Sequence, residues 1–160
     1  MKRLSLTAVA LLSVLGTAPA FADDIPVAVA GPMTGGQATF GRQFRDGAEQ
    51  AVADINAAGG VLGKKLRLEV GDDACDPKQA RSVAEKLSGM GVVVSVGHYC
   101  SSSSIPASDA YLDGTVLEIT PGSTNPLFTD RGMWNTFQSL RSVNWGLVDA
   151  GEICSTLLSA

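Results

Sequence analysis

The sequence predicts an α/β fold in which helices flank a parallel β-sheet. Short apolar runs rich in β-branched residues alternate along the chain with longer segments in which apolar residues recur at helical spacing. The apolar runs are nearly uninterrupted, as expected of strands that are covered on both faces. Repeated strand–helix units of this length indicate a parallel sheet with right-handed crossover connections.

The first half of the chain contains two predicted strands and one helix between them. Residues 25–30 form the first apolar run, and a glycine-rich turn at residues 31–41 follows it. Apolar positions at helical spacing predict a helix over about residues 42–57, and the glycine pair at 59–60 ends it. Alternating apolar and polar residues at 65–71 predict the second strand.

The second half of the chain continues the same alternation. Asp76 is a good N-cap and Pro77 suits the first helical position, so a helix is expected from there to Gly89. The other expected elements are a strand at 92–96, a helix that begins with the serines at 101–104 and runs to 112, and a strand at 115–120. After Thr136 the pattern breaks, and residues 138–160 show no clear fifth strand–helix unit.

The N-terminus is typical of a secretory signal peptide. Lys2 and Arg3 precede an apolar stretch at residues 4–15, and the small residues Ala20 and Ala22 fit a cleavage site after residue 22. The apolar stretch is too short to span a bilayer comfortably, since a spanning helix needs about 20 apolar residues. We therefore expect a signal peptide at residues 1–22, a mature chain that begins at residue 23, and a periplasmic location.

The charge balance argues against two classes of partner. The whole chain has 12 basic and 16 acidic residues, and removal of Lys2 and Arg3 makes the mature chain more acidic still. An acidic surface without basic clusters does not favour nucleic acid or anionic lipid headgroups. We expect a freely diffusing protein, a monomer, that binds a small molecule.

Functional groups are expected in the loops that follow the strands. In open α/β sheets, ligands bind beyond the carboxyl ends of the strands. Three of the predicted loops carry polar or aromatic side chains there. They are residues 31–41, with Thr34, Thr39 and Phe40, residues 99–104, with Tyr99 and the serine run, and residues 120–124.

The second and third loops combine an anion-binding feature with a cation-binding feature. Ser101 begins a serine run at a helix N-terminus, where hydroxyls, free N–H groups and the helix dipole bind a carboxylate or phosphate. Gly122 can present its carbonyl closely, and the Thr124 hydroxyl beside it can accept from an ammonium group; Ser123 between them is a further candidate. This pairing suits the zwitterionic end of an α-amino acid. The alternative, that Ser101 only caps its helix and Thr124 only satisfies a turn, stays open at this point.

Other kinds of site fit less well. Residues 59–65 resemble a phosphate-binding P-loop, but the glycine spacing is one residue short and no Ser or Thr follows the lysine. The three cysteines and the single histidine, His98, have no recognised metal-ligand spacing. Ser101 lacks the flanking glycines of a hydrolase nucleophile, and His98 lies on the same loop. We therefore expect a binding protein with no metal and no cofactor, and not an enzyme.

The loops and their spacing resemble the periplasmic leucine/isoleucine/valine-binding proteins of ABC importers, which have the type I periplasmic binding fold. The resemblance runs from Asp24 to about Thr136. It is carried by GAEQAVADIN at 47–56, DDACDPKQA at 72–80, GHYCSSS at 97–103, PASD at 106–109 and ITP at 119–121.

The resemblance implies roles for individual residues. Ser101 and Thr124 would hold the ligand's carboxylate and ammonium through hydroxyl and backbone N–H groups, and Gly122 would offer its carbonyl to the ammonium. Tyr99 and Phe40 would form apolar walls around the ligand side chain, where the family often has leucine and tyrosine. The family often has alanine at the position of Gly122.

A disulfide is expected between two of the three cysteines. In an oxidising compartment Cys75 and Cys100 can pair, which leaves Cys154 over. The resemblance implies the same pair, because both positions match the family's disulfide. The bridge would then lie directly beneath the binding loop.

The resemblance further implies a receptor with two hinged lobes that clamp a ligand and deliver it to membrane permease subunits. Branched-chain or related aliphatic amino acids are the expected ligands; an amide, urea or another polar small molecule is the alternative within the same fold. Residues 23–137 would be the N-terminal lobe. The family's sequence pattern stops after Phe137, so we interpret residues 138–160 as an aberrant tail from a shifted reading frame or a truncation.

Overall fold

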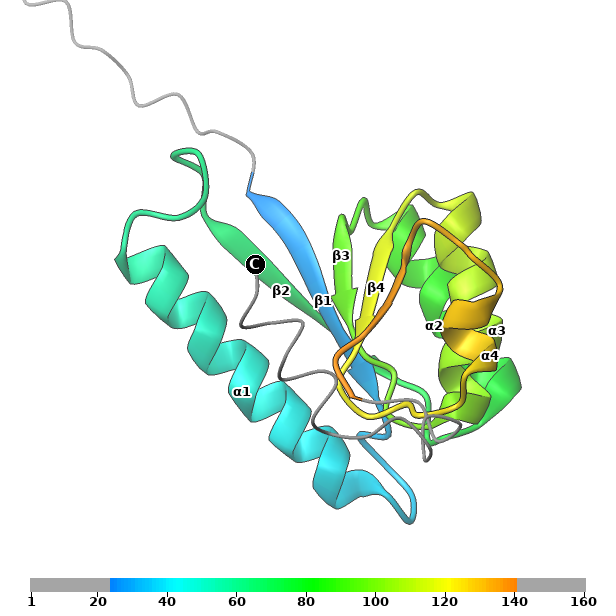
Figure 1. Ribbon diagram of the computed structural model, residues 1–160. Coiled ribbons are helices and arrows are strands. Elements are labelled where there is room, and N and C mark those ends of the chain that lie inside the picture. Colours follow the sequence, from blue (N-terminus) through cyan, green and yellow to red (C-terminus); the bar gives the residue numbers. More distant parts are fainter. Residues whose placement is uncertain (1–23, 141–160) are drawn as a thin grey trace, which may run out of the picture.

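The computed structural model describes residues 24–140 (Figure 1). The predicted signal peptide, Cys154 and most of the predicted tail lie outside these residues. Within the described part, no helix is both long and apolar enough to cross a membrane.

The sheet has five strands, and every pair of neighbours is parallel, which confirms the predicted fold class. The strands are β1 (Ile25–Gly31), β2 (Leu66–Asp72), β3 (Val94–Val96), β4 (Leu117–Thr120) and β5 (Thr136–Gln138). Their order across the sheet is β2-β1-β3-β4-β5. The chain therefore moves outward on one side of β1 first and on the other side afterwards, and the strand order reverses between β1 and β3.

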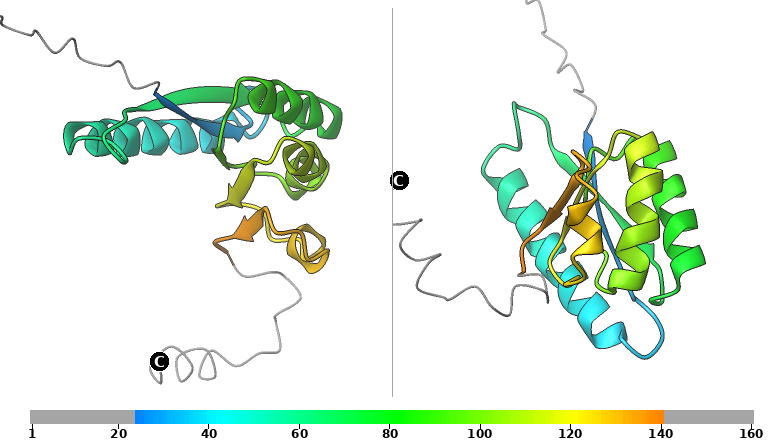
Figure 2. Two further views of the ribbon diagram at one scale, coloured as in Figure 1. Left: turned by 90° about the horizontal axis from the view of Figure 1, so that it is seen from above. Right: turned by 45° about the vertical axis from the view of Figure 1, so that its right-hand side comes forward.

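Four helices connect the strands. They are α1 (Ala38–Ala57), α2 (Pro77–Gly89), α3 (Ser101–Asp113) and the short α4 (Leu127–Asp130). Helix α1 lies beside β1 and β2, whereas α2, α3 and α4 gather on the opposite side of the sheet (Figures 1 and 2). As predicted, helices thus lie on both faces, and all of the strands end at the same edge of the sheet.

The core lies between the sheet and the pair α2 and α3. Small residues line this contact, and they let the two helices approach each other and the sheet closely. The buried members of the core are Ala28, Ala30, Ala80, Ala84, Leu87, Val92, Ala107, Ala110, Tyr111 and Val116. Helix α2 begins as predicted, because the Asp76 side chain accepts a hydrogen bond from the Gln79 backbone N–H at 2.8 Å.

Helix α1 begins four residues earlier than the glycine pattern predicts. Gly41, assigned to a turn, is a buried residue inside the helix. A Cβ atom at this position would lie 2.1 Å from the carbonyl oxygen of Pro32. The glycine is therefore needed for close packing of the first helical turns against the loop after β1, and it does not break the helix.

The structure also contains a fifth strand that the sequence pattern did not predict. Strand β5 pairs with β4, with Phe137 opposite Ile119, and the Ser139 N–H donates to the Thr120 carbonyl at 3.1 Å. The strand spans the predicted lobe boundary at residue 137. Strand β5 has only three residues, which is too short to show an alternation of apolar and polar side chains. Helix α4 before it is a single helical turn and shows no helical spacing either.

Candidate ligand-binding site

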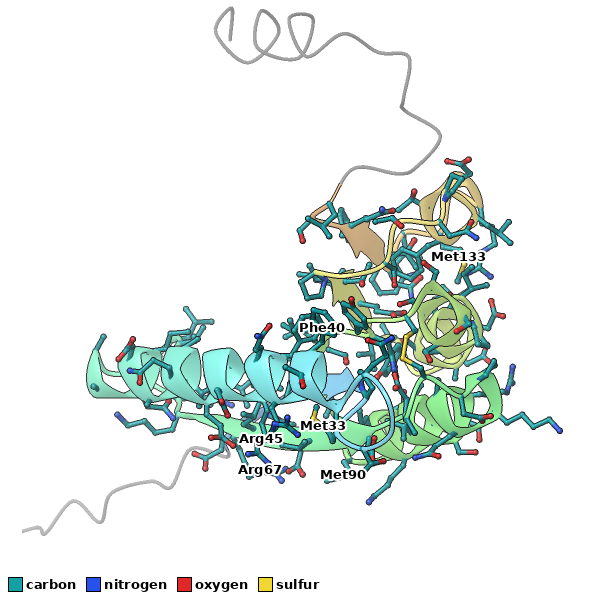
Figure 3. The ribbon with its side chains drawn as sticks, turned by 90° about the horizontal axis from the view of Figure 1, so that it is seen from below. Met33, Phe40, Arg45, Arg67, Met90 and Met133 are labelled. Atoms are coloured by element: carbon teal, nitrogen blue, oxygen red, sulfur yellow. A yellow bond between two sulfur atoms is a disulfide. The ribbon has the colours of Figure 1, made fainter. Side chains whose placement is uncertain are left out.

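The three predicted loops meet at the carboxyl edge of the sheet. They follow β1, β3 and β4, which are neighbours in the strand order. Residues 32–37, 97–100 and 121–126 make up the loops, and α3 begins directly after the second of them. The edge is at the lower end of the strands in Figure 1 and faces the viewer in Figure 3. It includes the point between β1 and β3 where the strand order reverses, the usual place for a ligand in such sheets.

Ser101 and Thr124 lie together, as the amino-acid hypothesis requires. The Ser101 Oγ atom accepts hydrogen bonds from the backbone N–H groups of Thr124, at 3.2 Å, and Asn125, at 3.3 Å. Ser101 and Thr124 are both half-buried, neither sealed in the core nor fully exposed. The Thr124 N–H is therefore already bonded to Ser101, which differs from the expectation that it would bind the ligand. Its hydroxyl and carbonyl remain for that role.

Gly122 packs directly against Tyr99. A Cβ atom at position 122 would lie 2.5 Å from Cδ2 of the Tyr99 ring and 3.0 Å from the Tyr99 carbonyl oxygen. The Gly122 N–H donates to the Thr120 hydroxyl at 3.3 Å. Its carbonyl accepts no hydrogen bond from residues 24–140, so it remains available to a donor.

Ser123 points away from the candidate site. It is fully buried, and its hydroxyl lies 2.5 Å from the Ser104 hydroxyl and donates to the Tyr99 carbonyl at 3.3 Å. Its backbone N–H donates to the Thr120 hydroxyl at 3.0 Å. The predicted ligand contact through the Ser123 side chain is therefore replaced by contacts that brace one loop against the other.

Phe40 and Tyr99 form one aromatic wall. Their rings are stacked, with centroids 4.5 Å apart and planes 11° apart, and Phe44 meets Tyr99 edge to face at 5.7 Å. Phe40 lies near the N-terminal end of α1, beside the edge where the strands end (Figure 3). Because 39% of Phe40 is exposed, the stack presents an apolar surface at the site.

The Cys75–Cys100 disulfide is present and joins the loop after β2 to the loop after β3 (Figure 3, yellow bond). The two Cα atoms are 5.6 Å apart. Cys100 is the N-cap residue of α3 and lies between Tyr99 and Ser101. The bridge thus anchors the segment that carries Tyr99 and Ser101, two of the predicted ligand contacts.

Asp72 anchors the loop after β1. Its carboxylate accepts from the Thr34 hydroxyl at 2.6 Å, from the Thr34 N–H at 3.2 Å and from the Ala74 N–H at 3.0 Å. Partial burial alone would raise the pKa of the Asp72 carboxyl, but these hydrogen bonds outweigh it and hold the pKa below its ordinary value. The sequence pattern gave Thr34 a place in this loop but did not identify Asp72 as its partner.

The ionisable side chains of Glu118, His98 and Asp73 lie buried beneath the loops. Burial raises the pKa of the Glu118 carboxyl well above its ordinary value, although the His98 N–H and the charge of Arg131 lower it in part. The His98 ring is fully buried and bonded to Asp73, which is also fully buried. A histidine enclosed in this way cannot reach a substrate. The one signal for this cluster in the sequence was the solitary histidine itself.

The stacked rings of Phe40 and Tyr99 form one wall of the candidate site. Two cavities, of about 330 Å³ along β2 and α2 and about 170 Å³ between α1 and the sheet, lie away from the three loops. Among residues 24–140, no group of three His, Cys, Asp or Glu side chains could hold a metal ion. The arrangement brings hydroxyl and carbonyl groups of two loops together beside one aromatic wall.

Known proteins resemble the chain over most of its length. The family model described as periplasmic binding protein matches residues 24–150. An amino acid binding protein of Pseudomonas aeruginosa is 45% identical over 159 residues, which cover 99% of this chain and 42% of that protein. The Leu/Ile/Val/Thr-binding protein of Salmonella typhimurium is 57% identical over 113 residues, or 71% of this chain and 31% of its own length.

The fold has solved counterparts as well. The structure of the branched-chain amino acid transporter substrate-binding protein LivJ from Streptococcus pneumoniae, in complex with isoleucine, matches with a TM-score of 0.71 and 27% identity. The match covers 75% of this chain and 34% of LivJ. The chain thus spans less than half the length of each of these proteins. With a family model matched from residue 24 to residue 150 and a fold that matches that of LivJ with a TM-score of 0.71, this chain belongs to the periplasmic binding protein family.

Proposed function

We propose that this chain forms the first lobe of an extracytoplasmic receptor that binds branched-chain or related aliphatic amino acids and delivers them to an ABC importer. The observation that carries the proposal is the junction between Ser101 and the loop after β4. It places a hydrogen-bond donor and a free carbonyl on adjacent loops, one for each pole of a zwitterion.

The Ser101 hydroxyl is suited to a carboxylate. A hydroxyl has one donor hydrogen and two acceptor lone pairs. The N–H groups of Thr124 and Asn125 occupy the acceptor side of Ser101, so the hydroxyl hydrogen is what remains for a ligand. The N–H groups of Ser101 and Ser102, at the start of α3, donate to no group among residues 24–140, and the helix dipole adds a positive potential there.

The loop after β4 is suited to an ammonium group. The Gly122 carbonyl and the Thr124 hydroxyl can both accept hydrogen bonds, and neither accepts one from residues 24–140. The stacked rings of Phe40 and Tyr99 form an apolar wall nearby. An aliphatic side chain would pack against that wall while the two poles of the amino acid meet the two loops.

The comparisons support the choice of ligand and transport role. The names of two relatives refer to amino acids, and the LivJ structure contains isoleucine. Since the chain spans less than half of these proteins, the permease partners and the second wall of the site are part of the proposal. A ligand on an open wall keeps much of its contact with water, so we expect binding weaker than micromolar for this chain alone.

A ligand panel followed by amide NMR tests the proposal. The 160-residue chain is titrated with L-leucine, L-isoleucine, L-valine, acetamide, urea and glucose. We expect the three amino acids to shift the amide signals of residues 99–102 and 122–125 at millimolar concentration, and the other compounds to leave them unchanged. A response to acetamide or urea without a response to the amino acids would favour the amide receptor and contradict the proposal. Micromolar or tighter binding of leucine would contradict only the expectation that this chain alone binds weakly.

A further inference from the structure

His98 lies beneath the candidate site and takes part in hydrogen bonds to several of the elements that form it. It is fully buried, and its partners come from the loop after β2, from α3, from β4 and from the loop after β4. A metal ligand or a catalytic base needs a ring that a metal ion or a substrate can reach. Neither role fits a ring that is closed off from solvent.

The His98 ring belongs to a buried chain of hydrogen bonds. Its Nδ1 atom contacts the Asp73 carboxylate, and the other Asp73 oxygen accepts from the Cys75 N–H at 2.8 Å. Its Nε2 atom lies 3.4 Å from the Tyr111 hydroxyl, which in turn lies 3.0 Å from the Ser95 hydroxyl. Because a carboxylate can only accept, the contact with Asp73 requires a proton on Nδ1.

The His98 backbone gathers the loops of the site. Its carbonyl oxygen accepts from the Thr120 hydroxyl at 2.5 Å, the Ser104 hydroxyl at 3.2 Å and the Ser123 hydroxyl at 3.4 Å. These hydroxyls come from the end of β4, the first turn of α3 and the loop after β4. The position of one carbonyl therefore sets how α3 meets the loop that carries Gly122 and Thr124.

The segment 73–75 consequently holds Tyr99 from both sides. Asp73 binds the residue before it, His98, and Cys75 is bridged to the residue after it, Cys100. One connection is a buried hydrogen bond and the other is covalent. Between them the backbone of Tyr99 has little freedom, and its ring rests on Gly122 and Phe40.

We propose that Asp73 and His98 form a positioning pair for ligand binding. The pair orients the His98 carbonyl and the Tyr99 ring, so that the loops after β3 and β4 meet in the geometry that Ser101 and Thr124 require. The affinity part of this inference rests on the proposed function; the loop geometry does not.

The protonation of His98 in the natural chain is the first test, because it needs no variant. Long-range ¹H–¹⁵N NMR distinguishes a ring protonated at Nδ1 from one protonated at Nε2. We expect a proton on Nδ1. A proton on Nε2 alone would mean that His98 does not donate to Asp73, and would overturn the inference.

The variant Asp73→Asn tests the positioning itself. Its side-chain oxygen can still accept from the Cys75 N–H, but its NH₂ group then faces Nδ1 and disfavours the natural tautomer. We expect shifted amide signals at residues 97–101 and 121–125 and a fall in L-leucine affinity of about tenfold, the usual size for a lost buried hydrogen bond to a charged group.

The matched control is Asp76→Asn, three residues along the same loop. Asp76 caps α2 and is exposed, so its replacement should leave both segments and the leucine affinity unchanged. If Asp73→Asn shifts residues 121–125 no more than Asp76→Asn does, or leaves the leucine affinity intact, the positioning pair is refuted. If leucine fails to bind the natural chain, the proposed function fails, and the amide signals and the tautomer still decide the inference.

Discussion

The hydroxyl oxygen of Ser101 lies 3.2 Å from the backbone nitrogen of Thr124 and joins the N-terminus of α3 to the loop after β4. The same oxygen accepts from the Asn125 N–H at 3.3 Å. One side chain thus joins two of the loops of the candidate site.

Replacement of Ser101 should therefore affect stability and binding together. In Ser101→Ala two backbone N–H groups lose their acceptor, and we expect the free energy of unfolding to fall by about 1 kcal/mol, with loss of the leucine response. Urea denaturation and amide NMR measure the two effects. The matched control is Ser102→Ala, at an exposed serine one residue along. Equal effects from both variants would contradict the role given to Ser101.

The sequence was sufficient to predict the type of fold and the meeting of the three candidate loops at one edge of the sheet. Apolar runs and helix caps predicted the first four strands and the three long helices. Because parallel strands end at the same edge of a sheet, the loops that follow them were expected to bring Ser101, Gly122 and Thr124 together. The direction of the Ser123 side chain could not be predicted, because a loop residue follows no period. Strand β5 was missed because three residues carry too little pattern, and the His98 cluster because its members lie far apart in the sequence and meet only in the folded chain.

Burial of Glu118 predicts a stability that depends on pH. An unfolded glutamate ionises near pH about 4.3. The pKa of Glu118 in the folded chain is well above its ordinary value, so folding retains a proton that the unfolded chain releases. The contribution of this group to stability is present below the unfolded pKa and is lost as the pH rises toward the folded pKa.

The variant Glu118→Gln cannot ionise and should escape this loss. Its free energy of unfolding, relative to the natural chain, should rise between pH 5 and pH 8 by at most about 1.4 kcal/mol per pH unit. Urea denaturation across this range measures the difference. Glu85→Gln, on the exposed face of α2, should show no such trend. A difference between Glu118→Gln and the natural chain that is independent of pH would refute the account.

Asp72 should respond in the opposite sense. Its pKa is held below the ordinary value, so its contribution to stability is present above the unfolded pKa and is lost as the pH falls through the folded pKa. Thr34→Val removes the hydroxyl donor and should raise the pKa of Asp72, so that its contribution to stability is smaller and its loss is complete at a higher pH. A carboxyl ¹³C titration detects the change. Thr39→Val, at an exposed threonine on α1, should leave the pKa of Asp72 unaltered.

The disulfide should contribute to stability through the loop that it closes. Cys75 and Cys100 are 25 residues apart, and for a loop of this size the chain-entropy relation gives about 3.5 kcal/mol. We expect the double variant Cys75→Ser, Cys100→Ser to lower the free energy of unfolding by about that amount. Urea denaturation under non-reducing conditions provides the measurement. A loss below about 1 kcal/mol would show that the unfolded chain gains little freedom when the bridge is removed.

Recognition of both poles of an amino acid is tested most directly by taking the ligand apart. Amide NMR spectra of the chain are recorded with L-leucine, with 4-methylpentanoate, which lacks the ammonium, and with 3-methylbutylamine, which lacks the carboxylate. Leucine should shift Ser101, Ser102 and residues 122–125 together, the acid only the start of α3, and the amine only the loop after β4. If leucine leaves these amides unchanged, or if either analogue reproduces the whole pattern, the two loops do not bind a zwitterion.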